Sequence, residues 1–436
     1  MILYNYKDLN KQNIEELCSR QAEDDNLVIS KVKDIISTVK TDGDIALYSY
    51  ASQFDKVELN QLFIDKTEIE KLAQEIPIKV KIAIDVAYQN IYTFHQTQLK
   101  TEDKVETMPG VNCWRETRAI EKVGLYIPGG TAVLPSTFLM LGIPAIIAGC
   151  KEIVVCSPPQ SDACLQDREG SINSYIAYVA TLLNIEKIYL VGGAQAVAAM
   201  AYGTETIPKV DKIFGPGNRY VTEAKKQIQN IVAIDMPAGP SEVLVIADET
   251  ANPSFVAADL LAQAEHGTDS QSILVSTSIK IIEKTIEEIE KQLIILPRRD
   301  IASKAIANSY AVYVETINEA MTFSNTYAPE HLILATENFE AIIPLIINAG
   351  SVFLGNLTPE SVGDYASGTN HTLPTSGFAK AFSGVSVDTF VKKITFQHLT
   401  ANGLKNIGNT VEVLATAEDL QAHKNAISIR INSIKN

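Results

Sequence analysis

A glutamine and a histidine lie three residues apart in the segment Gln263-Ala-Glu-His266-Gly-Thr-Asp269. Residues 253–262 before it carry alanine and leucine at helical spacing, and glycine, present at Gly267, commonly ends a helix. Gln263 and His266 would therefore project from one helix face, where an amide oxygen and an imidazole nitrogen can hold a divalent metal ion such as zinc. A polar last helical turn would explain the same residues, so this segment alone leaves both interpretations open.

A carboxylate and an imidazole stand side by side at Glu330 and His331, directly before the apolar run 332–335. This run predicts a buried strand, so both side chains would lie at the start of that strand. Such a pair can act as general acid and base, and a structural salt link at the strand edge is the alternative interpretation.

The segment 361–377 has few aliphatic residues and is rich in glycine, serine and threonine, unlike the chain around it. Long irregular segments in compact domains are usually functional or disordered. Asp364 offers a hard oxygen ligand for a metal, and His371 a neutral donor or acceptor. Further along, Glu418 and His423 are five residues apart, so they would not share a helix face, and spacing alone does not bring them to the same site.

Three glycine-rich turns each follow a predicted strand: Pro128-Gly-Gly130, Gly192-Gly193 and Gly215-Pro-Gly217. Open α/β sheets bind ligands beyond the carboxyl ends of their strands. No turn matches G-x-G-x-x-G, because Tyr220 stands where the third glycine is required. Ordinary turns would explain each glycine pair, but three of them in one small unit favour a nucleotide-binding domain.

These residues need a scaffold, and the periodicity of the chain predicts α/β architecture. Apolar runs at 123–127, 153–155, 187–191, 212–214 and 231–234 alternate with helical patterns, which is typical of a parallel sheet covered on both faces. A joint at Ala238-Gly-Pro240 precedes a second alternation with strands at 243–246, 272–276, 311–314, 332–335 and 350–354. Residues 105–117 are predicted to be extended around a turn at Pro109-Gly110, and the chain after Gly384 is predicted to be helical.

Composition excludes several classes of protein. A length of 436 residues exceeds what one core usually supports, and a net charge of -15 argues against nucleic acid and anionic membranes as partners. No signal peptide is recognised at Met1, and no apolar run is long enough to span a bilayer. The five cysteines are scattered without a Cys-x-x-Cys pair, which fits a reducing cytoplasm, the predicted location.

Read in chain order, the motifs resemble the histidinol dehydrogenase family. The resemblance spans roughly residues 124–423 and is most specific over 361–384. It rests on these segments: Val123-Gly-Leu-Tyr-Ile-Pro-Gly-Gly130, Gly192-Gly-Ala-Gln-Ala196, Phe214-Gly-Pro-Gly-Asn218, Pro237-Ala-Gly-Pro-Ser-Glu242, Gln263-Ala-Glu-His266, Tyr327-Ala-Pro-Glu-His331, Val362-Gly-Asp-Tyr-Ala366 and Gly368-Thr-Asn-His371.

For the fold, the resemblance implies two incomplete Rossmann-like domains with small helical terminal segments, and NAD held without the usual glycine fingerprint. We assign residues 1–26 to a helical leader, 27–122 with 240–380 to a metal and catalytic domain, 123–239 to an NAD-binding domain, and 381–436 to a helical segment. The family is a homodimer in which this last segment crosses to the partner subunit. The loop from Gln160 to Gly170 departs from the family pattern and is not expected to touch the chemistry.

For the function, the resemblance implies a zinc- and NAD-dependent enzyme, with one zinc ion per subunit. Its activity is the last two oxidations of histidine biosynthesis, from L-histidinol through L-histidinaldehyde to L-histidine. By motif match, the zinc ligands correspond to Gln263, His266, Asp364 and His423, the acid–base pair to Glu330 and His331, and the NAD site to Tyr126, Gln195 and Asn218. The substrate contacts correspond to Ser241, His371 and Glu418 together with the zinc ligands and His331. Crossing of the C-terminal segment would bring Glu418 and His423 into the site of the other subunit.

As a hypothesis, zinc orients the substrate, His331 removes the hydroxyl proton as hydride leaves to NAD, and Glu330 activates water for the aldehyde step. A thiohemiacetal on Cys150 or Cys156 is the competing route, although neither cysteine lies in activating polar surroundings. Two other classes stay open: a zinc hydrolase and a non-catalytic nucleotide-binding module.

Overall fold

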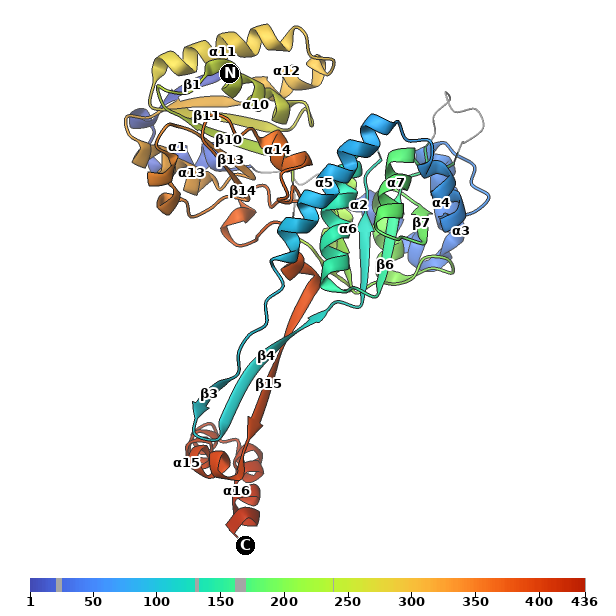
Figure 1. Cartoon of the computed structure of the whole chain (residues 1–436), viewed down its shortest axis with the longest axis vertical. Coiled ribbons are helices and arrows are strands. Elements are labelled where there is room, and N and C mark those ends of the chain that lie inside the picture. Colours follow the sequence, from blue (N-terminus) through green and yellow to red (C-terminus); the bar gives the residue numbers. More distant parts are fainter. Residues whose placement is uncertain (21–25, 130–132, 161–169, 238, 436) are drawn as a thin grey trace.

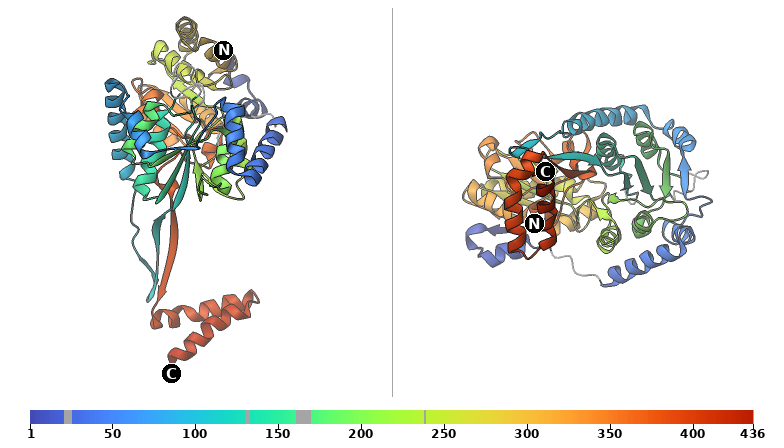
Figure 2. Two further views of the ribbon diagram at one scale, coloured as in Figure 1. Left: turned by 90° about the vertical axis from the view of Figure 1, so that its right-hand side faces the viewer. Right: turned by 90° about the horizontal axis from the view of Figure 1, so that it is seen from below.

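The structure is a computed structural model that describes residues 1–20, 26–129, 133–160, 170–237 and 239–435. The chain forms two units, each a largely parallel sheet with helices on both faces, and a long ribbon projects away from them (Figures 1 and 2). The predicted α/β class with two Rossmann-like sheets is therefore confirmed. Among the described residues, no helix is long and apolar enough to cross a membrane.

Unit 1 is built on a six-stranded sheet in which every pair of neighbouring strands is parallel. Across the sheet the strands are β1 (Ile2–Asn5), β12 (Tyr310–Tyr313), β11 (Gln271–Ser276), β10 (Glu242–Ala247), β13 (His331–Ala335) and β14 (Ser351–Leu354). One face of the sheet is covered by three helices: α10 (Pro253–Ala264), α11 (Ile279–Leu293) and α12 (Arg299–Ala307). The other face is covered by two helices, α1 (Lys11–Cys18) and α13 (Ile317–Tyr327), and by the short turns η1 (Tyr6–Asp8), η3 (Phe339–Ala341) and η4 (Ile343–Leu345). A short helix, α14 (Glu360–Tyr365), packs against α10.

Unit 2 has a second six-stranded sheet, parallel except for the edge strand β2, which runs antiparallel to β7. Across the sheet the strands are β2 (Phe63–Asp65), β7 (Lys187–Leu190), β6 (Glu152–Ser157), β5 (Lys122–Tyr126), β8 (Lys212–Phe214) and β9 (Ala233–Ile234). One face of the sheet carries four helices: α4 (Lys66–Ala73), α5 (Ile78–Gln96), α6 (Pro135–Ala148) and α7 (Ser174–Leu182). The other face carries α2 (Asn26–Asp42), α3 (Asp44–Tyr50), η2 (Ala51–Asp55), α8 (Gly193–Tyr202) and α9 (Arg219–Gln227).

Each sheet has one point where the order of its strands reverses. In unit 1 the chain proceeds outward from β10 through β11 to β12 and then returns to add β13 and β14 on the other side of β10. In unit 2 it proceeds from β5 through β6 to β7 and returns to add β8 and β9. The loops at such a reversal diverge to opposite faces and leave a crevice, which is where open α/β sheets bind ligands.

The N-terminal quarter of the chain packs differently from the predicted domains, which grouped 27–122 with 240–380. Helix α2 packs on α8 and α9, α4 on α7, and α5 on α6, so these helices belong to unit 2. The leader predicted to be helical contains α1, but it begins with β1, which pairs with β12 in unit 1. Helical periodicity shows that one face of a helix is apolar but not which sheet that face covers, so the grouping had no local signal.

A ribbon of three antiparallel strands carries the C-terminal helices away from both units (Figure 1). It consists of β3 (Val105–Met108), β4 (Val111–Ala119) and β15 (Val391–Leu399), followed by α15 (Ala401–Ala417) and α16 (Gln421–Lys435). The extended structure predicted around Pro109-Gly110 is confirmed. Gly403 packs so closely on this turn that an added Cβ would lie 2.1 Å from the Gly110 carbonyl oxygen.

The prediction that the chain is helical after Gly384 is wrong for β15, and His398 lies on this strand rather than on a helix. All nine residues of β15 pair with β4, where Phe396 stacks on Trp114 with ring centroids 5.5 Å apart. The partner strand is far away in the sequence, so this pairing left no local pattern to read. At the root of the ribbon η6 (Val387–Phe390) places Phe390 on Phe214 of β8, which ties the ribbon to unit 2.

Candidate active site

The predicted acid–base pair lies at the amino ends of β10 and β13, at the strand reversal of unit 1. Helix α13 begins with a capping box between Thr316 and Glu319 and ends at Ala328, whose φ of 55° turns the chain sharply toward β13. Glu330 and His331 follow that turn directly, so their backbone is fixed by a helix end on one side and a buried strand on the other. This departs from the usual rule, in which ligands bind at the carboxyl edge of such sheets.

Glu330 is almost fully buried, with 6% of its surface exposed. Its Oε2 accepts a hydrogen bond of 2.9 Å from the backbone N–H of Glu242, at the start of β10. Burial raises the pKa of the Glu330 carboxyl to about 8, although His331 beside it acts in the opposite direction. A carboxyl that titrates near neutral pH is well matched to the role of a general base.

His331 is held in one orientation by the same strand. Its Nδ1 lies 3.1 Å from the backbone carbonyl oxygen of Glu242, and because that oxygen only accepts, Nδ1 carries the proton. Nε2 is buried and makes no hydrogen bond, although Asp364 Oδ1 lies 3.3 Å away. Burial alone would lower the pKa of His331, but the charges of Glu330, Asp364 and Glu360 raise it to about 10. With this pKa the imidazole is charged near neutral pH and Nε2 carries a proton, so Nε2 becomes a position that takes a proton only where the pKa is lowered.

Gln263, in the last turn of α10, is fully buried beside this pair. In the one amide orientation that satisfies both of its polar atoms, the nitrogen donates to Glu360 Oε1 at 3.0 Å and the oxygen accepts from the Glu242 N–H at 2.6 Å. His266 lies just beyond the helix end and is exposed, yet close packing of protein around the imidazole lowers its pKa, while the nearby Asp364 acts to raise it. The structure thus brings Gln263, His266 and Asp364 to the same region.

Asp364 and His371 connect the two units. Burial would raise the pKa of Asp364, but contact with His331 and the charge of the other histidines lower it. His371 Nδ1 lies 2.7 Å from the Asp364 carbonyl oxygen, and its Nε2 lies 3.1 Å from the hydroxyl oxygen of Thr137 in the first turn of α6. Because α6 follows β5, this contact places the amino edge of the unit 1 sheet against the carboxyl edge of the unit 2 sheet.

The three residues predicted to bind NAD all lie at that carboxyl edge of unit 2. Tyr126 ends β5 and accepts a hydrogen bond of 3.1 Å from the Gly193 N–H, and burial raises the pKa of its phenol to about 12. Gln195 is buried in the first turn of α8. Asn218 caps α9, where its side chain accepts from the N–H groups of Tyr220 and Val221 at 3.0 and 3.2 Å. Tyr126 and Asn218 flank the reversal between β5 and β8, the expected ligand crevice.

A buried ion pair fixes the Gly215-Pro-Gly-Asn218 loop at this edge. Lys225 pairs with Asp235, and its Nζ also donates to the Gly215 carbonyl oxygen at 2.9 Å. Asp235 Oδ2 in turn accepts from the Gly215 N–H at 2.8 Å. Gly215 itself has a φ of 124°, and an added Cβ would lie 2.2 Å from the Tyr126 carbonyl oxygen, so only glycine fits there.

Comparison with known proteins identifies the family of this chain. The family model for histidinol dehydrogenase matches residues 18–431. The chain belongs to the histidinol dehydrogenase family. It is 54% identical to the histidinol dehydrogenase of Bacteroides thetaiotaomicron over 98% of both chains, and 52% identical to the chloroplastic histidinol dehydrogenase of Arabidopsis thaliana over 99% of this chain and 92% of that one.

A solved structure agrees with this assignment. The crystal structure of histidinol dehydrogenase from Elizabethkingia anophelis superimposes with a TM-score of 0.95 at 51% identity, covering 100% of this chain and 99% of that one. The ribbon and its terminal helices are therefore part of the fold of this histidinol dehydrogenase family member. As a member, it is an oxidoreductase of histidine biosynthesis.

Two of the predicted site residues do not reach the site of their own chain. Glu418 and His423 are exposed, at the end of α15 and in the first turn of α16, at the tip of the ribbon (Figure 1). Ser241, directly before β10, does lie at the site, where its carbonyl oxygen accepts from the Gln271 N–H at 3.1 Å.

Three residues at the site were missed by the sequence analysis. Glu360 had a readable signal, because it lies four residues before Asp364 and so shares a face of α14 with it. Glu242 had no readable signal in the sequence, because its backbone rather than its side chain contacts the acid–base pair. Thr137 had none either, since its contact with His371 crosses between units.

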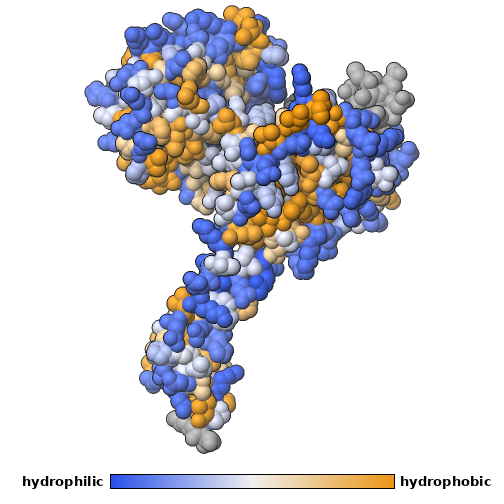
Figure 3. Space-filling model, viewed as in Figure 1, coloured by the Kyte–Doolittle hydropathy of each residue, from blue (hydrophilic) through white to orange (hydrophobic). Residues whose placement is uncertain are grey.

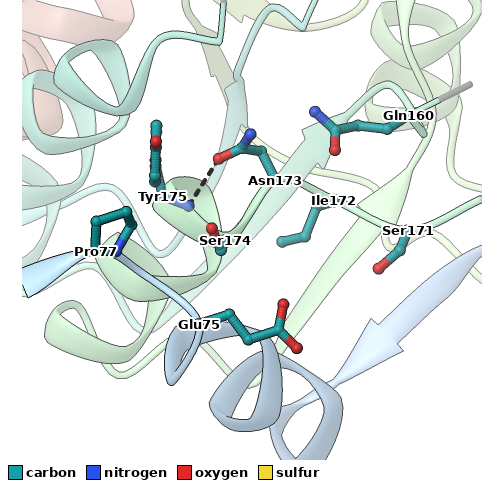
Figure 4. A pocket seen from close by; sticks show the side chains of 8 residues that line it. All are labelled: Glu75, Pro77, Gln160, Ser171, Ile172, Asn173, Ser174 and Tyr175. Atoms are coloured by element: carbon teal, nitrogen blue, oxygen red, sulfur yellow. Dashed lines mark hydrogen bonds between the residues drawn. The ribbon is translucent and has the colours of Figure 1, made fainter. Parts of the chain in front are cut away.

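A separate cavity of about 260 Å³ lies in unit 2 between the α4–α5 connection and the start of α7 (Figure 4). None of the predicted site residues lines it; its walls are Glu75, Pro77, Gln160, Ser171, Ile172, Asn173, Ser174 and Tyr175. In Figure 4 the Asn173 side chain caps α7 through the Tyr175 N–H, at 2.8 Å. The loop from Gln160 to Gly170, for which we predicted no role in the chemistry, lies mostly outside the described residues.

Proposed function

We propose that this chain is an NAD- and zinc-dependent histidinol dehydrogenase that oxidises L-histidinol to L-histidinaldehyde and then to L-histidine. The observation that carries the proposal is the buried imidazole of His331, with Nδ1 fixed as a donor and Nε2 without a hydrogen bond. Asp364, next to this base, contacts His371, and His371 contacts Thr137 at the edge of unit 2 where Tyr126 and Asn218 flank a crevice suited to a dinucleotide. Zinc has no redox chemistry, so the electrons must leave as hydride to NAD.

The donor set of the site fits zinc. Gln263, His266 and Asp364 together offer an amide oxygen, an imidazole nitrogen and a carboxylate oxygen, and they approach one another around His331. Within the described part of this single chain, no cluster of three or more His, Cys, Asp and Glu side chains is arranged to hold a metal ion. That is consistent with the proposal, because one ligand is a glutamine and the fourth, His423, would come from a second subunit. Bound zinc would polarise the substrate hydroxyl and, by repulsion, lower the pKa of His331.

In the first oxidation, His331 Nε2 takes the hydroxyl proton of the alcohol while the carbinol C–H bond breaks and its hydride passes to NAD. The products are the aldehyde, reduced NAD and one proton. In the second oxidation, Glu330 removes a proton from water as the water oxygen attacks the aldehyde carbon, and His331 returns the proton it gained in the first oxidation to the carbonyl oxygen, which completes the hydrate. His331 then takes a hydroxyl proton of the hydrate while a second hydride passes to a fresh NAD, which gives the carboxylic acid.

The competing thiol route has little support in the geometry. Cys156 is fully buried in the apolar core of unit 2, and burial raises the pKa of its thiol far above the usual value. Burial also raises the pKa of Cys150 to about 11, so neither cysteine holds an appreciable fraction of thiolate at neutral pH.

A homodimer with shared sites is supported by the projecting arm formed by β15, α15 and α16. Four large apolar side chains of the arm are exposed: Val413, Leu414, Leu420 and Ile429. Figure 3 shows hydrophobic surface along the arm. Apolar surface of this kind is typical of a protein interface. An arm seated on a second subunit would bury it and deliver Glu418 and His423 to that subunit. The cytoplasm remains the predicted location, consistent with four free cysteines in the described chain.

The direct test is turnover of L-histidinol by purified protein. We expect two equivalents of reduced NAD for each histidinol consumed, loss of activity after chelation, and recovery on adding zinc. Hydrolytic activity without nicotinamide reduction would instead indicate a zinc hydrolase. Nucleotide binding by protein that neither contains metal nor turns over histidinol would indicate a non-catalytic module.

Sharing of sites predicts complementation between two inactive variants. His423→Ala and His331→Ala subunits, co-expressed with different tags, should form mixed dimers in which one of the two sites is intact. With random pairing half of the dimers are mixed, so about one quarter of wild-type activity should return in the unfractionated mixture and about one half in purified mixed dimers. Activity is measured on the doubly tagged fraction, and each variant alone serves as control. No recovery would show that His423 serves its own chain.

A further inference from the structure

Arg20, in the segment that follows α1, has 11% of its side-chain surface exposed. It donates to the carbonyl oxygen of Cys18 at 3.1 Å, and it contacts four groups near the acid–base pair. Its guanidinium donates from Nε to Glu242 Oε1 at 2.7 Å and from a terminal nitrogen to Glu242 Oε2 at 2.9 Å. It also donates to the carbonyl oxygen of Tyr327 at 2.7 Å and lies 3.7 Å from the centre of the Tyr327 ring. The carbonyl oxygen of Ala328 is a weaker acceptor at 3.4 Å.

The groups that Arg20 contacts hold the acid–base pair in place. The backbone N–H of Glu242 donates to Glu330, and its carbonyl oxygen accepts from His331. Tyr327 and Ala328 form the turn that leads through Pro329 into the pair. Arg20 therefore joins the two backbone segments, at the starts of β10 and β13, whose spacing sets the geometry of Glu330 and His331.

The Glu242 carboxylate has no role of its own in the proposed chemistry, yet only 2% of its surface is exposed. Besides Arg20 it accepts from the Ser376 N–H at 2.7 Å. A buried carboxylate without its cation would be strongly destabilised. The planar fork of arginine bonds both oxygens at once while stacking on Tyr327, which the ammonium group of a lysine does not reproduce.

We propose that Arg20 is a positioning residue for the oxidation, acting through Glu242 and the turn at Tyr327 and Ala328 on Glu330 and His331. Arg20 does not touch the reacting atoms. The N-terminal segment thereby becomes part of the catalytic apparatus. This inference rests on the proposed function. Misplacement of catalytic groups by about 1 Å lowers rates by about a hundredfold, so the effect is expected on kcat rather than on NAD binding.

The test compares Arg20→Met and Arg20→Lys with wild type in the full dimeric enzyme. We expect kcat for histidinol oxidation to fall about 10- to 100-fold in Arg20→Met and less in Arg20→Lys, with KM for NAD within about twofold of wild type. The isotope effect on kcat with histidinol deuterated at the carbinol carbon should rise, because the chemical step becomes slower relative to product release.

The matched control is Val312→Ala, which removes buried side-chain volume from β12 of the same sheet, away from the pair. It should lower Tm while leaving kcat and the isotope effect unchanged. If the Arg20 variants, like this control, show only a lower Tm and a smaller folded fraction, with kcat per folded enzyme and the isotope effect unchanged, the positioning role is refuted. If Arg20→Met does not fold, the kcat and the isotope effect of Arg20→Lys test the positioning role instead. Failure of wild type to oxidise histidinol would refute the proposed function itself, so the two failures are distinct.

Discussion

Replacement of His331 by asparagine is expected to lower kcat for both oxidation steps by about 10²- to 10⁴-fold, the usual contribution of a general acid–base residue. The asparagine amide can still donate toward the Glu242 carbonyl oxygen, but it has no group that takes a proton at the position of Nε2. Both steps release a hydroxyl proton with the hydride, so both lose the same catalyst. In free energy the loss corresponds to about 3 to 5 kcal/mol of the barrier.

The measurement is the rate of NAD reduction with L-histidinol and, separately, with L-histidinaldehyde as substrate. His398→Asn is the matched control, because His398 is exposed on β15 and belongs to no part of the proposed site. It should leave both rates unchanged. A His331→Asn enzyme that oxidised either substrate at the wild-type rate would remove His331 from the mechanism of that step.

Replacement of Glu330 by glutamine is expected to slow the second oxidation step much more than the first. Aldehyde oxidation should fall by about 10²- to 10⁴-fold, because the glutamine side chain is not a base that activates water. Alcohol oxidation should stay within severalfold of wild type, since the glutamine oxygen can still accept from the Glu242 N–H and so preserve the geometry around His331. L-histidinaldehyde should therefore accumulate when histidinol is supplied.

The readout is the ratio of reduced NAD to histidinol consumed, which should fall from two toward one. Glu337→Gln is the control, because Glu337 is an exposed glutamate just beyond β13. Equal slowing of both steps by Glu330→Gln would contradict the division of roles. It would instead make the carboxylate a general determinant of the charge state of His331, with which it is in close contact, at 3.7 Å.

The catalytic geometry depends on how two similar units face each other. Unit 1 contributes the amino edge of its sheet, with Ser241, Glu330 and His331, and unit 2 contributes the carboxyl edge of its own. The contact between His371 and Thr137 spans the boundary. In the proposed mechanism, a base on one unit and a hydride acceptor on the other would let the substrate react between them.

Much of the fold could be predicted from local pattern. The alternation of apolar runs and helical periods indicated the α/β class and the two sheets, and the helical spacing over 253–262 marked most of α10. The reason is that buried parallel strands and helices packed on them each leave a short-range pattern in the sequence. The segments Gln263–His266, Glu330–His331 and Asp364–His371 likewise drew attention through the types of their residues.

Other features depend on contacts between distant residues and leave no such pattern. The pairing of β15 with β4, the packing of α2 to α5 on unit 2 and the burial of Arg20 against Glu242 are of this kind. The proposed chemistry of His331 also depends on contacts between residues that are distant in the sequence. Its residue type was evident from the sequence, but its fixed Nδ1 proton and free Nε2 arise only where the backbone of β10 passes beside it, because a hydrogen bond is decided by atoms in space and not by their order along the chain.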